Sequence, residues 1–240
     1  PRLRLRRDVA LASHGTADDV YHLGVSVCLV RLAKLHRRRL AGDLRRASDR
    51  MHALEEWADS VHPVGGMSSH VLLAAVQTAL AGDGAPARAM CKFSDYRDRD
   101  SAVKAAGNAS WDMLFLRMLH ASELGLTPYR ALNGPTALLT FDRQFAESAK
   151  GVIGAFSGVG ADGLELPGSV AKLRQHLQRD VLSDPRMLAR LDEMAQRLRS
   201  QQHERLTSPR SEAPPKMEDL LEAALDDLFP ATIQDSVGDD

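Results

Sequence analysis

Cysteine is scarce in this 240-residue chain, which contains only Cys28 and Cys91 and no CxxC pair. Two isolated thiols build neither a zinc site nor a disulfide framework, so we interpret them as buried thiols in a reducing compartment and expect a cytoplasmic protein. No apolar run approaches the roughly 18 residues that a membrane span needs, so no membrane partner is expected. The basic first residues are followed by neither the apolar core nor the cleavage site of a secretory signal.

Several catalytic and cofactor motifs are also missing. The nine histidines form no i,i+4 pair and no HExxH, which makes a zinc site on a helix improbable. No phosphate-binding Walker loop and no Gly-x-Ser-x-Gly elbow occurs. Residues 158–163 spell GxGxxG, but Leu164-Glu-Leu-Pro167 follows directly and the proline stops any helix there. We therefore expect a flexible loop at this position and no dinucleotide site.

The composition that remains is ordinary for a globular protein, with 44% hydrophobic and 26% charged residues. The net charge of −1 conceals a division, because nine acids face one base from residue 212 onward, which leaves about +7 on the rest of the chain. Residues 31–50 alone hold eight bases and two acids. Such a stretch, with Arg38 and Arg39 in it, can grip a phosphate backbone, and the alternative is a solvated helix face.

Apolar residues at helical spacing predict a helix-rich chain. The predicted helices cover residues 17–46, 47–60, 71–81, 101–124, 169–180 and 184–205. The short apolar run at residues 136–141, bounded by Pro135 and Asp142, predicts a buried strand. Residues 3–8, where leucines alternate with arginines, predict a second short strand that ends near Asp8. The fold class expected from this pattern is helix-rich α/β.

Two aspartates stand in settings that chemistry can use. Asp112 lies one helical turn after Asn108 among large apolar side chains, where a carboxylate is costly to bury unless it is paired or binds a cation. Its alternative role is a first-turn acid that complements the helix dipole. Asp142 follows the predicted strand 136–141 directly, where α/β sheets place their ligand sites, and its alternative role is a helix N-cap.

Together, the acid early in an apolar helix, the turn, the short strand and the Thr140-Phe-Asp142-Arg-Gln-Phe145 segment resemble the second half of a PIN-type nuclease domain. The resemblance covers residues 108–145. It implies a small parallel sheet flanked by helices, and three or four carboxylates that hold Mg²⁺ or Mn²⁺ for hydrolysis of RNA phosphodiesters. Hard divalent metals prefer such oxygen ligands. By this resemblance Asp112 and Asp142 are metal ligands, and Thr140 supports the site.

The first half of the chain departs from the family pattern, which leaves an incomplete site or an unusual setting for the missing acids. We take Asp8 and Glu56 as the candidates that complete the acidic set, and we expect at least one early acid to join Asp112 and Asp142. Asn108, Thr140, Arg38 and Arg39 are then the substrate contacts. The first hypothesis is a metal-dependent ribonuclease, whose partners are RNA and a protein inhibitor or further copies of the chain. The alternative is a non-catalytic RNA- or protein-binding module that retains the PIN-like fold.

The resemblance and the composition divide the chain into a PIN-like domain at residues 1–168, a helical extension at 169–206, a proline-bearing linker at 207–216 and an acidic tail at 217–240. The tail carries apolar residues at helical spacing: Met217, Leu220, Leu221, Ala224, Leu225, Leu228 and Phe229. This stripe predicts an amphipathic helix that docks on the basic residues 31–50 or on a neighbouring subunit. Docked there, it acts as an electrostatic brake on nucleic-acid binding, and the alternative is that it completes the core.

Overall fold

The structure is a computed structural model that describes residues 17–64, 69–81, 88, 90–123, 177–207 and 216–230. These residues form seven α-helices and two short 3-10 helices. The α-helices are α2 (Ala17–Leu40), α3 (Ala47–Ser60), α4 (Ser69–Leu80), α6 (Arg99–Glu123), α9 (Arg179–Leu182), α10 (Pro185–Thr207) and α11 (Met217–Leu228). The 3-10 helices are η1 (His62–Val64) and η2 (Phe93–Asp95).

The described part of the chain is all-helical, so the α/β prediction with a small parallel sheet is wrong. Within these residues the one β-type contact is an isolated antiparallel bridge between Ala81 and Leu177. The strands predicted at residues 3–8 and 136–141 lie outside the described residues. The described part is all-helical because its helices bury their apolar sides against one another, so a helix occupies the central position for which a sheet was expected.

Most of the predicted helices are present. Residues 47–60 form α3 as predicted, and α4, α6 and α10 begin and end close to their expected positions. The first helix is shorter than predicted because Gly42 stops it. Gly42 has a positive φ of 82°, its N–H donates to the Arg39 carbonyl, and the N–H of Asp43 donates to the Arg38 carbonyl. This pair of bonds is a Schellman motif, which satisfies the last carbonyls of α2 and turns the chain into α3.

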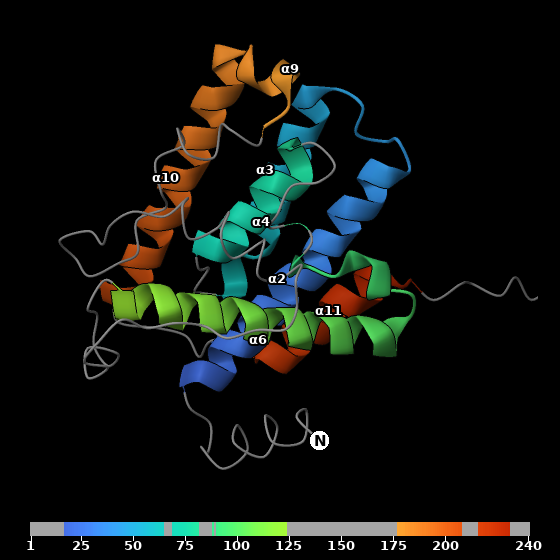
Figure 1. Cartoon of the computed structure of the whole chain (residues 1–240), viewed down its shortest axis with the longest axis vertical. Helices are drawn as coiled ribbons and strands as arrows, with labels where there is room; N and C mark the ends of the chain where they lie inside the picture. Colours follow the sequence, from blue (N-terminus) through green and yellow to red (C-terminus); the bar gives the residue numbers. More distant parts are fainter. Residues whose placement is uncertain are drawn as a thin grey trace, which may run out of the picture.

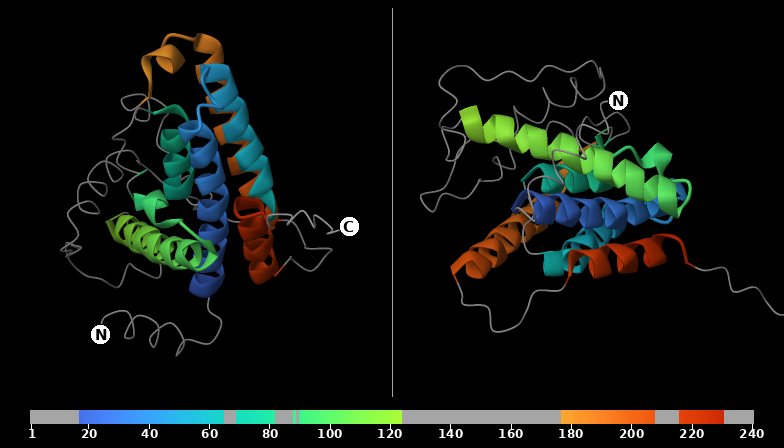
Figure 2. Two further views of the ribbon diagram at one scale, coloured as in Figure 1. Left: turned by 90° about the vertical axis from the view of Figure 1, so that its right-hand side faces the viewer. Right: turned by 90° about the horizontal axis from the view of Figure 1, so that it is seen from below.

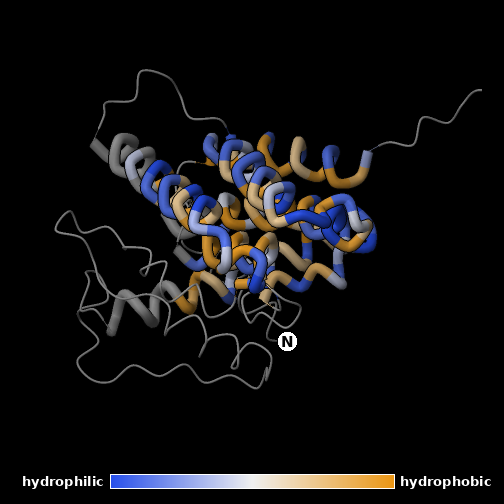
Figure 3. Tube along the Cα trace, turned by 90° about the horizontal axis from the view of Figure 1, so that it is seen from above, coloured by the Kyte–Doolittle hydropathy of each residue, from blue (hydrophilic) through white to orange (hydrophobic). Residues whose placement is uncertain are grey.

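Helix α2 is the central element of the bundle, because it contacts α3, α4, α6 and α11. Figures 1 and 2 show α6 on one side of α2 and α3 with α11 on the other. Consequently α2 is buried on all sides over its middle, including Leu29 and Leu32. The outer helices are amphipathic, and hydrophobic and hydrophilic residues alternate along them in Figure 3. No helix in the described ranges combines the length and the apolar character that crossing a membrane requires.

The seam between α2 and α6 is fixed by polar contacts. His22 donates from Nε2 to the Gly107 carbonyl at 3.0 Å, and its ring lies 4.7 Å from that of Trp111. Deeper in the seam the buried Ser26 hydroxyl donates to the Ser110 hydroxyl at 3.2 Å. These bonds satisfy polar groups that would otherwise be costly to bury, and they fix how α6 lies along α2.

Candidate functional site

Asp112 lies on α6 with its side chain 15% exposed, and it pairs with Lys92 at 2.8 Å between Nζ and Oδ2. Lys92 is the residue before η2 and has the left-handed backbone conformation, with a φ of 55°. A residue other than glycine adopts this conformation at a cost, so the surrounding structure must hold it there. The charge of Asp112 is therefore compensated by the chain's own lysine.

Glu56 lies on α3 and belongs to a different ion pair. Arg38 donates to its carboxylate at 2.9 Å, and His52 stands one turn before it at 3.4 Å. The hydrogen bond from Arg38 lowers the pKa of Glu56 below its ordinary value, so the carboxylate stays ionised at neutral pH. Glu56 is exposed and serves to connect α3 with the end of α2.

The remaining residues of the expected acidic site cannot be placed beside these two. Asp8, Asp142 and Thr140 lie outside the described residues. Among the residues that the structure does describe, no group of three His, Cys, Asp or Glu side chains could hold a metal ion. Asn108 lies half-buried on α6, one turn before Asp112. The described part of the chain thus brings Asp112 and Glu56 to separate basic partners rather than to one another.

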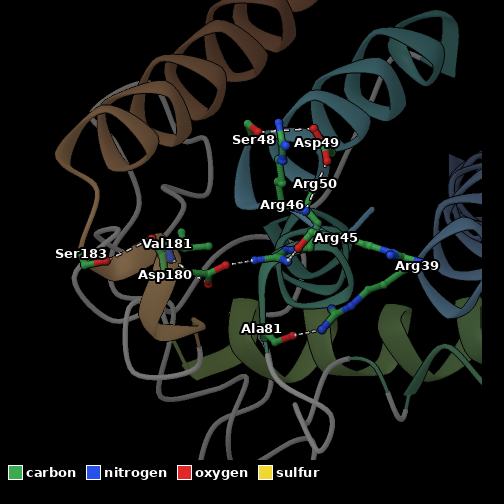
Figure 4. Close-up of polar contacts among 10 residues, drawn as sticks. All are labelled: Arg39, Arg45, Arg46, Ser48, Asp49, Arg50, Ala81, Asp180, Val181 and Ser183. Carbon is green, nitrogen blue, oxygen red and sulfur yellow. Dashed lines mark hydrogen bonds and ion pairs between the residues drawn. The ribbon is translucent and has the colours of Figure 1, made fainter. Parts of the chain in front are cut away.

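Arg39 of α2 and Arg50 of α3, both within the basic stretch 31–50, bond to groups within the fold (Figure 4). Arg39 donates to the carbonyls of Thr78 and Ala81 at 2.6 Å and 2.5 Å and so caps the carboxyl end of α4. The buried Arg50 donates to the Arg45 carbonyl at 2.9 Å and pairs with Asp180. The last carbonyls of a helix have no intrahelical partner and attract cations, which accounts for Arg39 at the carboxyl end of α4. Arg50 instead joins the start of α3 to Asp180 of α9.

The best-formed interface between distant parts of the chain lies where α11 docks on α2. The predicted tail helix is confirmed, and its apolar stripe enters the core: Leu225 is 0% exposed, and Met217, Ala224 and Leu228 are also buried. The helix therefore contacts the basic helix α2 and also completes the core, whereas the brake on nucleic-acid binding stays a prediction. Gly24 of α2 lies beside Met217, since a Cβ there would be 4.0 Å from the Met217 sulfur, an ordinary contact distance.

A rim of ion pairs surrounds this apolar contact. Lys34 of α2 pairs with Asp227 at 2.5 Å. Arg99, in the first turn of α6, pairs with Asp226 at 2.6 Å and also with Glu222. The two carboxylates raise the pKa of the Arg99 guanidinium. These side chains are exposed, so each pair contributes little to stability by itself and mainly orients the helix.

Arg37 contacts the carboxyl end of α11 through a hydrogen bond and an aromatic ring. Its Nη1 donates to the Leu228 carbonyl at 2.8 Å and its Nη2 donates to the Tyr96 carbonyl at 2.6 Å. Its guanidinium carbon also lies 4.6 Å from the centre of the Phe229 ring. One side chain therefore ties together α2, the end of η2 and the end of α11. We call the surface formed by Gly24, Lys34, Arg37 and Arg99 the α11 seat.

Sequence reasoning indicated residues 31–50 as one docking surface for the tail, and Lys34 and Arg37 lie within it. It missed Arg99 and Tyr96, which belong to a polar connector with no apparent role. The signal that could have identified Arg99 is the i,i+4 spacing of Glu222 and Asp226, which places two acids on one side of α11 and calls for a shared base.

The seat is chemically suited to hold an amphipathic acidic helix, with an apolar floor, bases on the rim and an arginine at the helix end. No family model, no curated protein and no solved structure matches the chain.

Proposed function

We propose that this chain is a non-catalytic binding module that recognises a partner protein at the α11 seat. The observation that carries the proposal is the way α11 docks. It is a short helix, separated from α10 by the proline-bearing residues 208–215, and it buries an apolar stripe while its acids meet Lys34 and Arg99. Helices that bind in grooves of other proteins use the same arrangement of apolar anchors and a charged rim.

A protein helix fits the seat better than RNA does. A phosphate backbone could neutralise Lys34, Arg37 and Arg99, but it has no counterpart to the apolar side chains of α11 that fill the floor of the seat. The neighbouring bases Arg38 and Arg39 are already bonded to Glu56 and to the carboxyl end of α4. Both free cysteines are buried, which supports our placing the module in a reducing compartment, the cytoplasm.

A metal-dependent ribonuclease is the second proposal, and it rests on the resemblance of residues 108–145 to PIN domains. Its set would be Asp112 and Asp142 with Mg²⁺ or Mn²⁺. Asp112 is mostly buried, and a metal there must displace Lys92 from its carboxylate. Incubating the full chain with structured RNA and Mn²⁺ tests this proposal. Cleavage that disappears in Asp112→Asn would favour the ribonuclease over the binding module.

The binding module is tested with the full chain. A protease site is introduced within residues 208–215 and cut, so that α11 is held only by its contacts. A fluorescent peptide of residues 216–230 is then added, and its anisotropy is followed. We expect the peptide to replace the cut segment and to bind saturably, because every contact of α11 with the seat can form without the linker.

Two results would contradict the binding module. One is a peptide that fails to bind to the cut protein. The other is a cut protein that loses its helical circular dichroism and does not recover it when the peptide is added, which would make α11 an inseparable part of the fold.

A further inference from the structure

We propose that Arg37 determines which helices the α11 seat accepts, by recognising the carboxyl end of the bound helix together with an aromatic residue just beyond it. This inference rests on the proposed function, and it names the chemical class of the partner. The partner is an acidic amphipathic helix whose last turn has two acids and a leucine, followed by an aromatic residue and a proline, as in Asp226-Asp-Leu-Phe-Pro230.

One hydrogen bond of Arg37 is to Tyr96, which lies outside α11, so this bond can orient the guanidinium without a bound helix. The Tyr96 carbonyl accepts from Nη2 at 2.6 Å, which leaves Nη1 and the flat face of the guanidinium for the helix. The planar fork of arginine presents its donors in fixed directions, so this anchor fixes where the partner carbonyl must lie. A lysine could not hold both carbonyls and offer a flat face to a ring.

The carbonyl that Arg37 contacts is available only at a helix end. The last carbonyls of an α-helix have no intrahelical partner, and Leu228 is the final residue of α11. The N–H of Phe229 donates to the Leu225 carbonyl at 2.8 Å, which closes the helix, and Pro230 prevents its continuation. A helix that continued past this point would use the carbonyl itself and push its next turn into Arg37.

Arg37 also sets the direction of the bound helix. Met217 lies near Gly24 and Asp227 lies beside Lys34, so α11 runs parallel to α2. Parallel helices bring their negative carboxyl ends together, which is unfavourable unless a cation stands between them. Arg37 is in the last turn of α2 and provides that charge. An antiparallel helix would place its N–H groups there instead, and these repel a guanidinium.

The aromatic residue is the remaining element of recognition. The ring of Phe229 lies 4.6 Å from the guanidinium carbon of Arg37, within the range of a cation–π contact. The rim pairs of Lys34 and Arg99 lie on exposed side chains, where many acidic helices could satisfy them equally. Discrimination among acidic helices therefore falls to Arg37 and the ring that covers it.

The test uses the cut full chain and peptides of residues 216–230. On the unaltered protein we expect a Phe229→Leu peptide, which keeps apolar volume without a ring, to bind about two- to fivefold more weakly than the natural peptide. In Arg37→Lys protein we expect natural-peptide binding to weaken by about tenfold or more, and the preference for phenylalanine over leucine to disappear. Arg38→Lys is the matched control, since Arg38 reaches Glu56 instead of α11 and should change neither value.

Equal binding of the phenylalanine and leucine peptides to the unaltered protein would overturn this inference, and this result needs no altered protein. So would an Arg37→Lys protein that keeps the full preference for phenylalanine. Both outcomes leave the binding module in place, because the natural peptide still binds. Failure of the natural peptide on the unaltered protein refutes the proposed function itself, so the two failures are distinguishable.

Discussion

Removing buried leucines one at a time should show whether α11 opens separately from the rest of the bundle. Leu225 on α11 is 0% exposed and Leu191 on α10 is 1% exposed. A buried leucine replaced by alanine loses about 3 to 5 kcal/mol, and we take about 3 kcal/mol because both helices lie at the edge of the bundle. Leu225→Ala and Leu191→Ala should therefore lower the free energy of unfolding in urea by similar amounts.

Amide hydrogen exchange then separates the two sites. The amide of Phe229, bonded to the Leu225 carbonyl at 2.8 Å, reports the opening of α11. In Leu225→Ala this amide should exchange about 100-fold faster, since about 1.4 kcal/mol corresponds to a factor of ten. In Leu191→Ala it should exchange at the rate of the unaltered protein, because that substitution weakens the closed bundle and the α11-open state equally.

The reasoning is refuted if both variants accelerate exchange at Phe229 by the same factor. That result would mean that α11 opens only when the whole bundle unfolds. A helix that never leaves the seat separately cannot give way to a partner, and the proposed binding module would lose its physical basis. Amides in the middle of α2 serve as the reference for global unfolding, and they should accelerate in both variants.

Three further predictions follow from single contacts. Asp112→Asn should lower the free energy of unfolding by about 1 to 2 kcal/mol, because Lys92 loses a charged hydrogen bond. Mn²⁺ should leave the melting temperatures of the unaltered protein and of the Asp112→Asn variant unchanged. The hydrogen bond from Arg38 lowers the pKa of Glu56, so the ionised Glu56 stabilises the fold fully above its ordinary pKa of 4.5. This stabilisation is lost as the pH falls through the lower pKa of the folded state. Glu56→Gln should therefore flatten the pH dependence of the free energy of unfolding below pH 4.5 and leave it unchanged between pH 6 and 8. Gly24→Ala places a Cβ 2.8 Å from Val64 Cγ1, and this crowding should cost about 1 to 3 kcal/mol, more than the helix-propensity gain of about 1 kcal/mol. Adding Val64→Ala should remove the crowding. A double variant that is no more stable in urea than Gly24→Ala would contradict this account.

The positions of the helices could be predicted because their causes are local. Apolar residues repeat at helical spacing in residues 47–60 and 217–229, and such an amphipathic stripe forms a helix in almost any context that buries it. The predicted end of the first helix was wrong by several residues because Gly42 was not recognised as its stop, although that signal is also local. The α/β class was wrong because strand pairing is non-local, and one apolar run does not show what packs against it.

The roles of charged side chains were decided only by the tertiary structure. The sequence alone determined that Arg37, Arg38 and Arg39 end a basic helix, and that acids line one side of the tail. Successive helix residues point about 100° apart, so these three arginines reach three different elements: α11, α3 and α4. Likewise Asp112 on α6 pairs with Lys92, which lies before η2 and has a left-handed backbone conformation. A charge acquires its role from the partner that packing places beside it, and packing is a property of the whole chain.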